Sequence, residues 1–198
     1  WWNFVDWADE YGSGVSPGAD EGENAVINLE FVYAAQRAAR LADRMGLPFE
    51  ANWYSHLAES VGRATVERCW DSTRGLIAET PEKKIFSQHA NVMAVLTGVL
   101  PEDQEVAVME RVLTDSTLIQ CTYYYRFYLN RALKRVGMGD RYLEQLYPWQ
   151  DMLDIGLTTF AENPEPTRSD CHAWSASPLY DVLALVVGIE PDAPGSLK

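Results

Sequence analysis

The sequence predicts an all-α fold built from αα-hairpins in series. Apolar residues recur at three- and four-residue spacing along most of the chain, and strand-like alternation is scarce. The connections between the periodic segments are short and are marked by Gly or Pro, which is typical of helical hairpins and not of βαβ units. At 198 residues we treat the chain as a single unit, residues 1–198.

The first two expected helices form one hairpin. The first covers residues 24–45 and ends at Gly46, and the second runs from Pro48 to about Trp70. Each carries an apolar stripe at helical spacing. The stripe residues are Ile27, Phe31, Ala34, Ala38, Leu41 and Met45 in the first helix, and Tyr54, Leu57, Val61 and Ala64 in the second.

The next two helices have clear local start signals. Ser87 is a suitable N-cap for a short apolar helix that runs through Leu96 and ends near Gly98. Pro101 begins another helix that ends near Thr114, and acidic residues in its first turn complement the helix dipole.

Three more helices are expected in the last third of the chain. One carries its apolar residues at positions 125, 129, 133 and 136 and is closed by Gly137; the others cover residues 140–154 and 178–187. Residues 8–23 and 156–177 have no helical period, so we expect two long loops. Long loops in compact domains are often functional.

Composition excludes several classes of partner. The net charge is −13 and no run of basic residues exists, so nucleic acid and anionic membrane surfaces are not expected partners. Cys69, Cys121 and Cys171 are far apart, which favours reduced thiols over a disulfide framework or a zinc site. The three histidines show no metal-ligand spacing, so we expect no metal and no cofactor.

Residues 158–178 form the most unusual stretch, which we call the loop 158–178. It combines Glu162 and Asp170 with Arg168, His172 and Trp174. A sugar site needs such a mixture, because carboxylates exchange protons, planar donors bind hydroxyls and an aromatic face stacks on the ring. The alternative is a proline-rich connector in which Asp170 caps a turn and Trp174 packs on the helices below.

Two other segments are candidates with open alternatives. Asp6 and Trp7 open a run of acidic and aromatic residues that suits recognition of sugar hydroxyls, or simply forms a solvated acidic loop. His89 lies in the first turn of the helix capped by Ser87, where it points into a cleft or serves as a buried structural partner. The aromatic residues at positions 123–125 and 127 favour core packing over a stacking platform.

The motifs at these positions resemble those of bacterial α-L-rhamnosidases, which belong to the six-hairpin glycosidase superfamily. TTFAE at 158–162 and RSDCHAWSASP at 168–178 carry the resemblance most specifically. FVDW at 4–7, FSQHANVMAVL at 86–96 and YPWQDML at 147–153 occur in the same order as in that family.

The resemblance implies a partial (α/α) six-hairpin toroid, of which this chain is the C-terminal portion. It implies hydrolysis of terminal α-L-rhamnosyl bonds with inversion, with Glu162 as general base and Asp6, Trp7 and His172 near the sugar. The family's general acid belongs to an upstream acidic motif in the missing N-terminal hairpins. Ala161 stands where relatives often carry a bulkier residue, so the pocket wall beside Glu162 is expected to differ.

Our hypothesis adds His89 to the sugar-binding residues, and Trp174 because of its place in the loop 158–178. It expects Glu162, His172 and Asp6 to converge on one cleft. The isolated chain is expected to be inactive and to expose apolar faces that favour dimerisation. The rival hypotheses are a non-catalytic helical scaffold that binds a protein partner and an inactive carbohydrate-binding relative.

Overall fold

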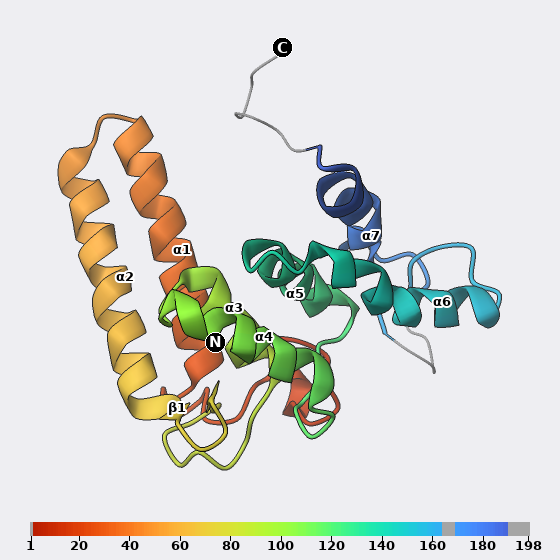
Figure 1. Cartoon of the computed structure of the whole chain (residues 1–198), viewed down its shortest axis with the longest axis horizontal. Coiled ribbons are helices and arrows are strands. Elements are labelled where there is room, and N and C mark those ends of the chain that lie inside the picture. Colours follow the sequence, from red (N-terminus) through yellow and green to blue (C-terminus); the bar gives the residue numbers. More distant parts are fainter. Residues whose placement is uncertain (1, 164–168, 190–198) are drawn as a thin grey trace. The chain divides into compact units, whose positions relative to one another are not determined.

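Figure 1 shows the computed structural model of the chain, which describes residues 2–163 and 169–189. The chain divides into two compact units, Trp1–Cys121 (unit 1) and Thr122–Lys198 (unit 2). The regular structure of both described parts is helical apart from one short β-hairpin, so the all-α prediction is confirmed. Treatment of residues 1–198 as one domain stays a prediction.

Unit 1 is dominated by a long helical hairpin, the orange and yellow pair in Figure 1, made of α1 (Ala25–Arg44) and α2 (Pro48–Cys69). Asn24 starts α1, because its Oδ1 accepts the backbone N–H of Ile27 at 2.8 Å. Gly46 follows α1 with φ of 72°, a left-handed conformation that Gly adopts without strain. Both expected helices are therefore confirmed.

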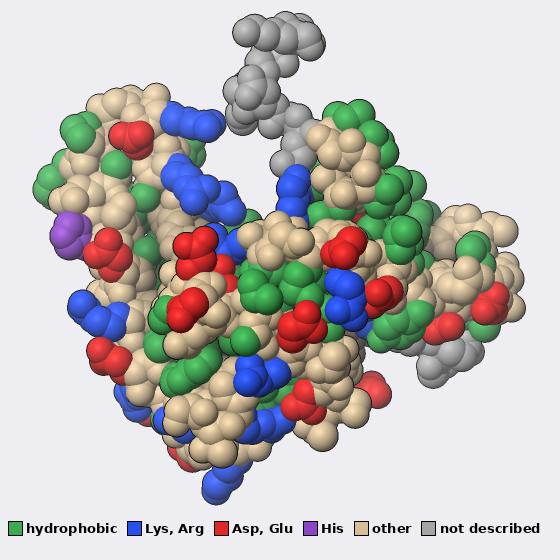
Figure 2. Space-filling view, viewed as in Figure 1, with side chains coloured by type: hydrophobic (Ala, Val, Ile, Leu, Met, Phe, Trp, Pro, Cys, Tyr) green, Lys and Arg blue, Asp and Glu red, His purple; other side chains and the backbone are tan. Residues whose placement is uncertain are grey.

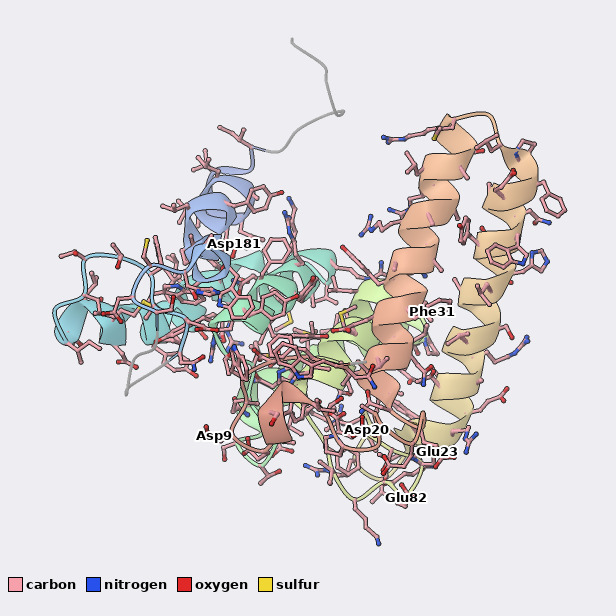
Figure 3. All side chains as sticks on the ribbon, turned by 180° about the vertical axis from the view of Figure 1, so that it is seen from behind. Asp9, Asp20, Glu23, Phe31, Glu82 and Asp181 are labelled. Carbon is pink, nitrogen blue, oxygen red and sulfur yellow. The ribbon has the colours of Figure 1, made fainter. Side chains whose placement is uncertain are left out.

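The buried face of α1 is not the apolar stripe that its spacing suggested. Phe31, which Figure 3 labels, is 44% exposed, and Leu41 and Met45 of the same stripe are 60% and 65% exposed. Leu29 and Val32 are fully buried instead. The helix itself was predicted correctly, but the prediction of which face is buried was wrong.

Small side chains explain the shift of the buried face. The contact between α1 and α2 is built from Val32, Ala35 and Ala58, and α2 also buries Gly62. A Cβ on Gly62 would come within 2.7 Å of Cγ1 of Val99. Val99 follows α3, so it is this side chain that limits the space beside Gly62. The face of α1 that packs on α2 is the one with smaller side chains, and the bulkier stripe is left outside it.

The rest of unit 1 follows α2. The elements are β1 (Trp70–Asp71), β2 (Leu76–Ile77), α3 (Gln88–Thr97) and α4 (Glu102–Thr114). The antiparallel pair β1–β2 was not expected from the sequence. The capping prediction is confirmed, since Ser87 Oγ accepts the Ala90 N–H at 3.0 Å and Gly98 ends α3 with φ of 65°.

Unit 2 contains α5 (Tyr123–Arg135), η2 (Gly139–Leu146), α6 (Tyr147–Asp154), η3 (Ala173–Ala176), α7 (Ser177–Asp181) and η4 (Val182–Val187). The single helix expected over 140–154 is divided into the 3₁₀ helix η2 and the α-helix α6. Pro148 lies in the first turn of α6 and has no N–H to bond to the preceding turn, which explains the division. The helix expected over 178–187 is α7 continued by a π-helical turn, η4.

Apolar side chains are exposed over α7 and η4. Leu183, Val186 and Val187 are 50%, 53% and 56% exposed, and Figure 2 shows hydrophobic side chains gathered over this part of the chain. Across the described ranges, no helix has the length and apolar character needed to cross a bilayer.

Asp181, labelled in Figure 3, is a fully buried carboxyl group at the end of α7. Asn130 Nδ2 donates to its Oδ2 at 2.8 Å. Burial raises the pKa of Asp181 above its ordinary value, although the hydrogen bond from Asn130 opposes the shift.

Asp181→Asn is expected to stabilise the chain at neutral pH. Because the folded state binds the Asp181 proton more tightly than the unfolded state, this carboxyl's contribution to stability is complete below its unfolded pKa. That contribution is lost as pH rises through the folded pKa. Thermal unfolding followed by circular dichroism should show a higher Tm for the variant at pH 7 and little difference near pH 4. The exposed Asp140→Asn is the control, and a lower Tm for Asp181→Asn at pH 7 would contradict the assignment.

Candidate active site

Asp6 and His89 form a buried pair in unit 1. His89 Nε2 lies 2.7 Å from Asp6 Oδ2, and both side chains are fully buried. Burial alone would lower the pKa of His89, but the neighbouring Cys121 and the Asp6 carboxylate outweigh it and raise that pKa well above the ordinary value. The Asp6 carboxylate thus favours the protonated form of the imidazole.

The N-terminal segment that carries Asp6 is held by its own backbone. Val5 N–H donates to the carbonyl of Gly14 at 2.7 Å, and Phe4 and Val15 form an antiparallel bridge, so residues on the two sides of the turn at 12–14 pair with each other. Asp6 Oδ1 accepts the backbone N–H of Trp7 at 2.9 Å, while Oδ2 faces His89. One carboxylate thus joins this segment to the first turn of α3.

Trp7 is the member of this group with accessible ring surface. It is partly exposed, and its ring lies 4.9 Å from Phe4 and 6.0 Å from Trp2, measured between centroids. Such an aromatic group offers a face on which a sugar ring stacks.

The predicted acidic loop separates into buried and exposed members. Asp6 is fully buried, so the solvated-loop alternative is wrong for this residue. Asp9, Asp20 and Glu23, labelled in Figure 3, are exposed, and Glu23 pairs with Arg68 at 2.9 Å. Most of the acidic charge at this end of the chain is therefore solvated surface charge.

In unit 2 the loop 158–178 brings Glu162 and His172 together. The two described arms of the loop are bonded through their backbones, because Glu162 N donates to Ser169 O at 3.1 Å and His172 N donates to Phe160 O at 2.6 Å. His172 Nδ1 lies 4.0 Å from Glu162 Oε2 and 3.1 Å from Ser169 Oγ. Arg168, the guanidinium noted in this loop, lies outside the described residues.

The Glu162 side chain is almost, but not completely, buried. It is 7% exposed, so most of its water shell is removed while a small part of its surface remains accessible. A carboxylate in such a setting can accept a proton from water, and an imidazole beside it can bind a hydroxyl group. Acid–base chemistry is the reaction type this pair suits.

Trp174 continues the same group. Its ring lies 4.4 Å from His172 and 5.0 Å from Tyr124, between centroids. The element η3 that carries it is fixed from below, since Trp149 Nε1 donates to Ser175 O at 2.7 Å. The alternative in which Trp174 packs on the helices below is therefore correct in part, because its ring contacts Tyr124 of α5.

A pocket of about 310 Å³ opens beside Trp174, and its size is at the lower end for small-molecule sites. Its lining residues are Tyr124, Phe127, Ala173, Trp174, Ala176 and Ser177. Tyr123 and Tyr125 are buried, so core packing is confirmed for them. For Tyr124 and Phe127 that prediction was incomplete, because their spacing along α5 turns them toward the pocket.

Ala161 does not have the surroundings we expected. It is fully buried in a core cluster with Tyr123, Trp149 and Met152. Its side chain therefore supports Glu162 from the core instead of forming the pocket wall beside it.

Sequence reasoning missed Glu79, a fully buried carboxylate in unit 1. It accepts a hydrogen bond from the Tyr11 hydroxyl at 2.6 Å and from Asn24 Nδ2 at 3.0 Å. The only signal was its position directly after the apolar residues 76–78. Among the described residues, no group of three or more His, Cys, Asp or Glu side chains is arranged to hold a metal ion.

Comparison with known proteins places these features in context. The family model described as the bacterial alpha-L-rhamnosidase six-hairpin glycosidase domain matches residues 1–183. A rhamnosidase from Klebsiella oxytoca with rhamnose bound shares 24% identity over 96% of this chain and 37% of its own, with a TM-score of 0.77. A GH78 family rhamnosidase of Bacillus sp. GL1 shares 23% identity over 98% of this chain and 22% of its own, with a TM-score of 0.83.

At these identities the two solved structures establish the fold alone. The chain spans only about a third and a fifth of their lengths. No curated protein matches the sequence.

Ala161→Leu is expected to destabilise unit 2, because the added atoms have no space beside Trp149 and Met152. Overpacking of this kind costs about 1–3 kcal/mol. Urea unfolding followed by tryptophan fluorescence measures the loss, and the exposed Ala173→Leu is the control. Equal stability of Ala161→Leu and the parent chain would show that Ala161 lies against open space.

Proposed function

Because the six-hairpin model matches residues 1–183, this chain belongs to the bacterial alpha-L-rhamnosidase six-hairpin glycosidase family, and we propose that the full-length protein hydrolyses terminal α-L-rhamnosyl bonds with inversion. The observation that carries the proposal is the pair of Glu162 and His172, 4.0 Å apart on bonded arms of one loop. Binding of rhamnose by the Klebsiella oxytoca relative supports the choice of sugar.

In this proposal Glu162 is the general base. Its carboxylate takes a proton from a water molecule as that water attacks the anomeric carbon from the side opposite the leaving group. Inverting enzymes hold the acid and base about 6.5–9.5 Å apart so that the water fits between base and sugar. We place the general acid outside these 198 residues, in the remainder of the full-length protein.

The five residues expected around the sugar divide into those that contact it and those that support a contacting residue. Trp7, His172 and Trp174 are partly exposed and offer ring faces or a ring N–H to a pyranose. Asp6 and His89 are fully buried, so we assign them to the support of Trp7 and not to direct contact. That all five serve one sugar stays a prediction.

Glu162→Gln in the full-length enzyme is expected to lower kcat on an aryl α-L-rhamnoside by at least about 100-fold, because the amide cannot accept the water's proton. KM should change little, since the amide preserves the shape of the side chain. Exposed Glu144→Gln, also in unit 2, is the control and should leave both constants unchanged.

Turnover near the parent value for Glu162→Gln would end the assignment of the base. A parent enzyme that binds rhamnose and hydrolyses no rhamnoside would instead identify an inactive carbohydrate-binding relative. A parent that does neither would favour the helical scaffold.

The isolated 198-residue chain is expected to show no rhamnosidase activity, because it has no general acid in this proposal. Its exposed apolar residues on α1, α7 and η4 favour self-association, so size-exclusion chromatography with light scattering should report a dimer. Measurable hydrolysis by this chain alone would show that the acid lies within it.

A further inference from the structure

A line of buried side chains in unit 1 joins the start of α1 to Asp6. Asn24, Glu79 and Tyr11 are 1%, 0% and 3% exposed; Asn24 and Tyr11 both bond to Glu79, and the Tyr11 ring packs against that of His89, the partner of Asp6. These three residues come from three separate parts of the sequence and have no role in the chemistry proposed for Glu162.

Glu79 is the centre of this line. Its Oε1 accepts the Tyr11 hydroxyl at 2.6 Å and its Oε2 accepts Asn24 Nδ2 at 3.0 Å, so both oxygens are used. Its carbonyl accepts the Ala25 N–H at 2.8 Å and its N–H donates to Ile85 at 2.9 Å. Side chain and backbone of Glu79 are therefore both fixed, next to the N-terminus of α1.

Tyr11 transmits that fixed position to His89. The bond from its hydroxyl to Glu79 has the short length of a charge-assisted O–H···O⁻ contact. Burial raises the pKa of Tyr11 well above its ordinary value and Glu79 raises it further, so the hydroxyl keeps its proton and remains a donor. The Tyr11 ring lies 5.0 Å from the His89 ring at 46°.

His89 binds one of the two oxygens of the Asp6 carboxylate. His89 Nε2 holds Asp6 Oδ2 at 2.7 Å, which leaves Oδ1 directed at the Trp7 N–H at 2.9 Å. The two oxygens of one carboxylate therefore connect the His89 ring with the backbone at Trp7.

We propose that Tyr11 and Glu79 are positioning residues that, through His89 and Asp6, fix the backbone at Trp7 from which the indole projects. The inference rests on the proposed function, in which Trp7 contacts the sugar. An apolar pair in place of Tyr11 and Glu79 would avoid the desolvation of a buried carboxylate, so packing alone does not account for them. What the polar pair adds is direction, because hydrogen bonds fix angles that apolar contacts leave free.

The test uses the full-length enzyme and Tyr11→Phe, which removes one oxygen and keeps the ring. KM for an aryl α-L-rhamnoside is expected to rise about tenfold, the equivalent of one buried hydrogen bond, with kcat within about twofold of the parent. Tyr33→Phe, which removes a more exposed hydroxyl on α1 contacted by Arg37, is the matched control and should leave both constants unchanged.

A second variant separates positioning from stability. Tyr11→Phe leaves Glu79 with one oxygen unpaired and lowers Tm, whereas Tyr11→Phe combined with Glu79→Met removes the charge and should restore Tm. Asn24 Nδ2 keeps its bond to the Pro17 carbonyl at 2.7 Å in that variant. Positioning predicts that KM stays raised in the double variant although Tm recovers; recovery of both would overturn the proposal.

Glu162→Gln in the same enzyme shows which proposal has failed. An inactive Glu162→Gln together with a parent-like KM for Tyr11→Phe overturns the positioning role alone. An active Glu162→Gln overturns the proposed function, whatever Tyr11→Phe does. A raised KM in Tyr11→Phe, a restored Tm in the double variant and an inactive Glu162→Gln support both.

Discussion

The bonding of two buried carboxylates is the constraint on which unit 1 depends. Asp6 and Glu79 are both fully buried, and a charge removed from water is tolerated only where its oxygens are bonded. His89 and the backbone of Trp7 serve Asp6, while Tyr11 and Asn24 serve Glu79. Because the donors come from the N-terminal segment, α1 and α3, satisfying two acids also fixes three elements against one another.

In unit 2 the carboxylate of Glu162 is only partly removed from water, and the backbone around it is fixed instead. Glu162 is held by backbone bonds between the arms of its loop, and Ala161 beside it is buried against Trp149. The Glu162 carboxylate retains a small accessible area and lies 4.0 Å from His172 Nδ1. A fully buried acid is suited to hold structure, and an acid at the edge of solvent is suited to exchange protons. The chain contains both kinds of surroundings, and the proposed function assigns proton exchange to Glu162.

Helix positions were predictable because their signals are local. The Ser87 cap and the Gly98 stop are decided within one turn of backbone, as are Asn24 and Gly46 around α1. The buried face of α1 was not predictable in the same way. Two apolar stripes run along that helix, and only the close approach of α2 selects the one made of smaller residues.

The sequence by itself determined the all-α class, most helix boundaries and, through its motifs, the resemblance on which the candidate residues rest. Tertiary structure alone decided that Asp6 and His89 are a buried pair, that Glu79 and Tyr11 lie behind them, and that Tyr124 lines a pocket. Helix signals act over a few residues, whereas these contacts join positions up to 83 residues apart. Neither spacing nor composition encodes which distant side chains share a buried site, because packing of the whole unit makes that choice.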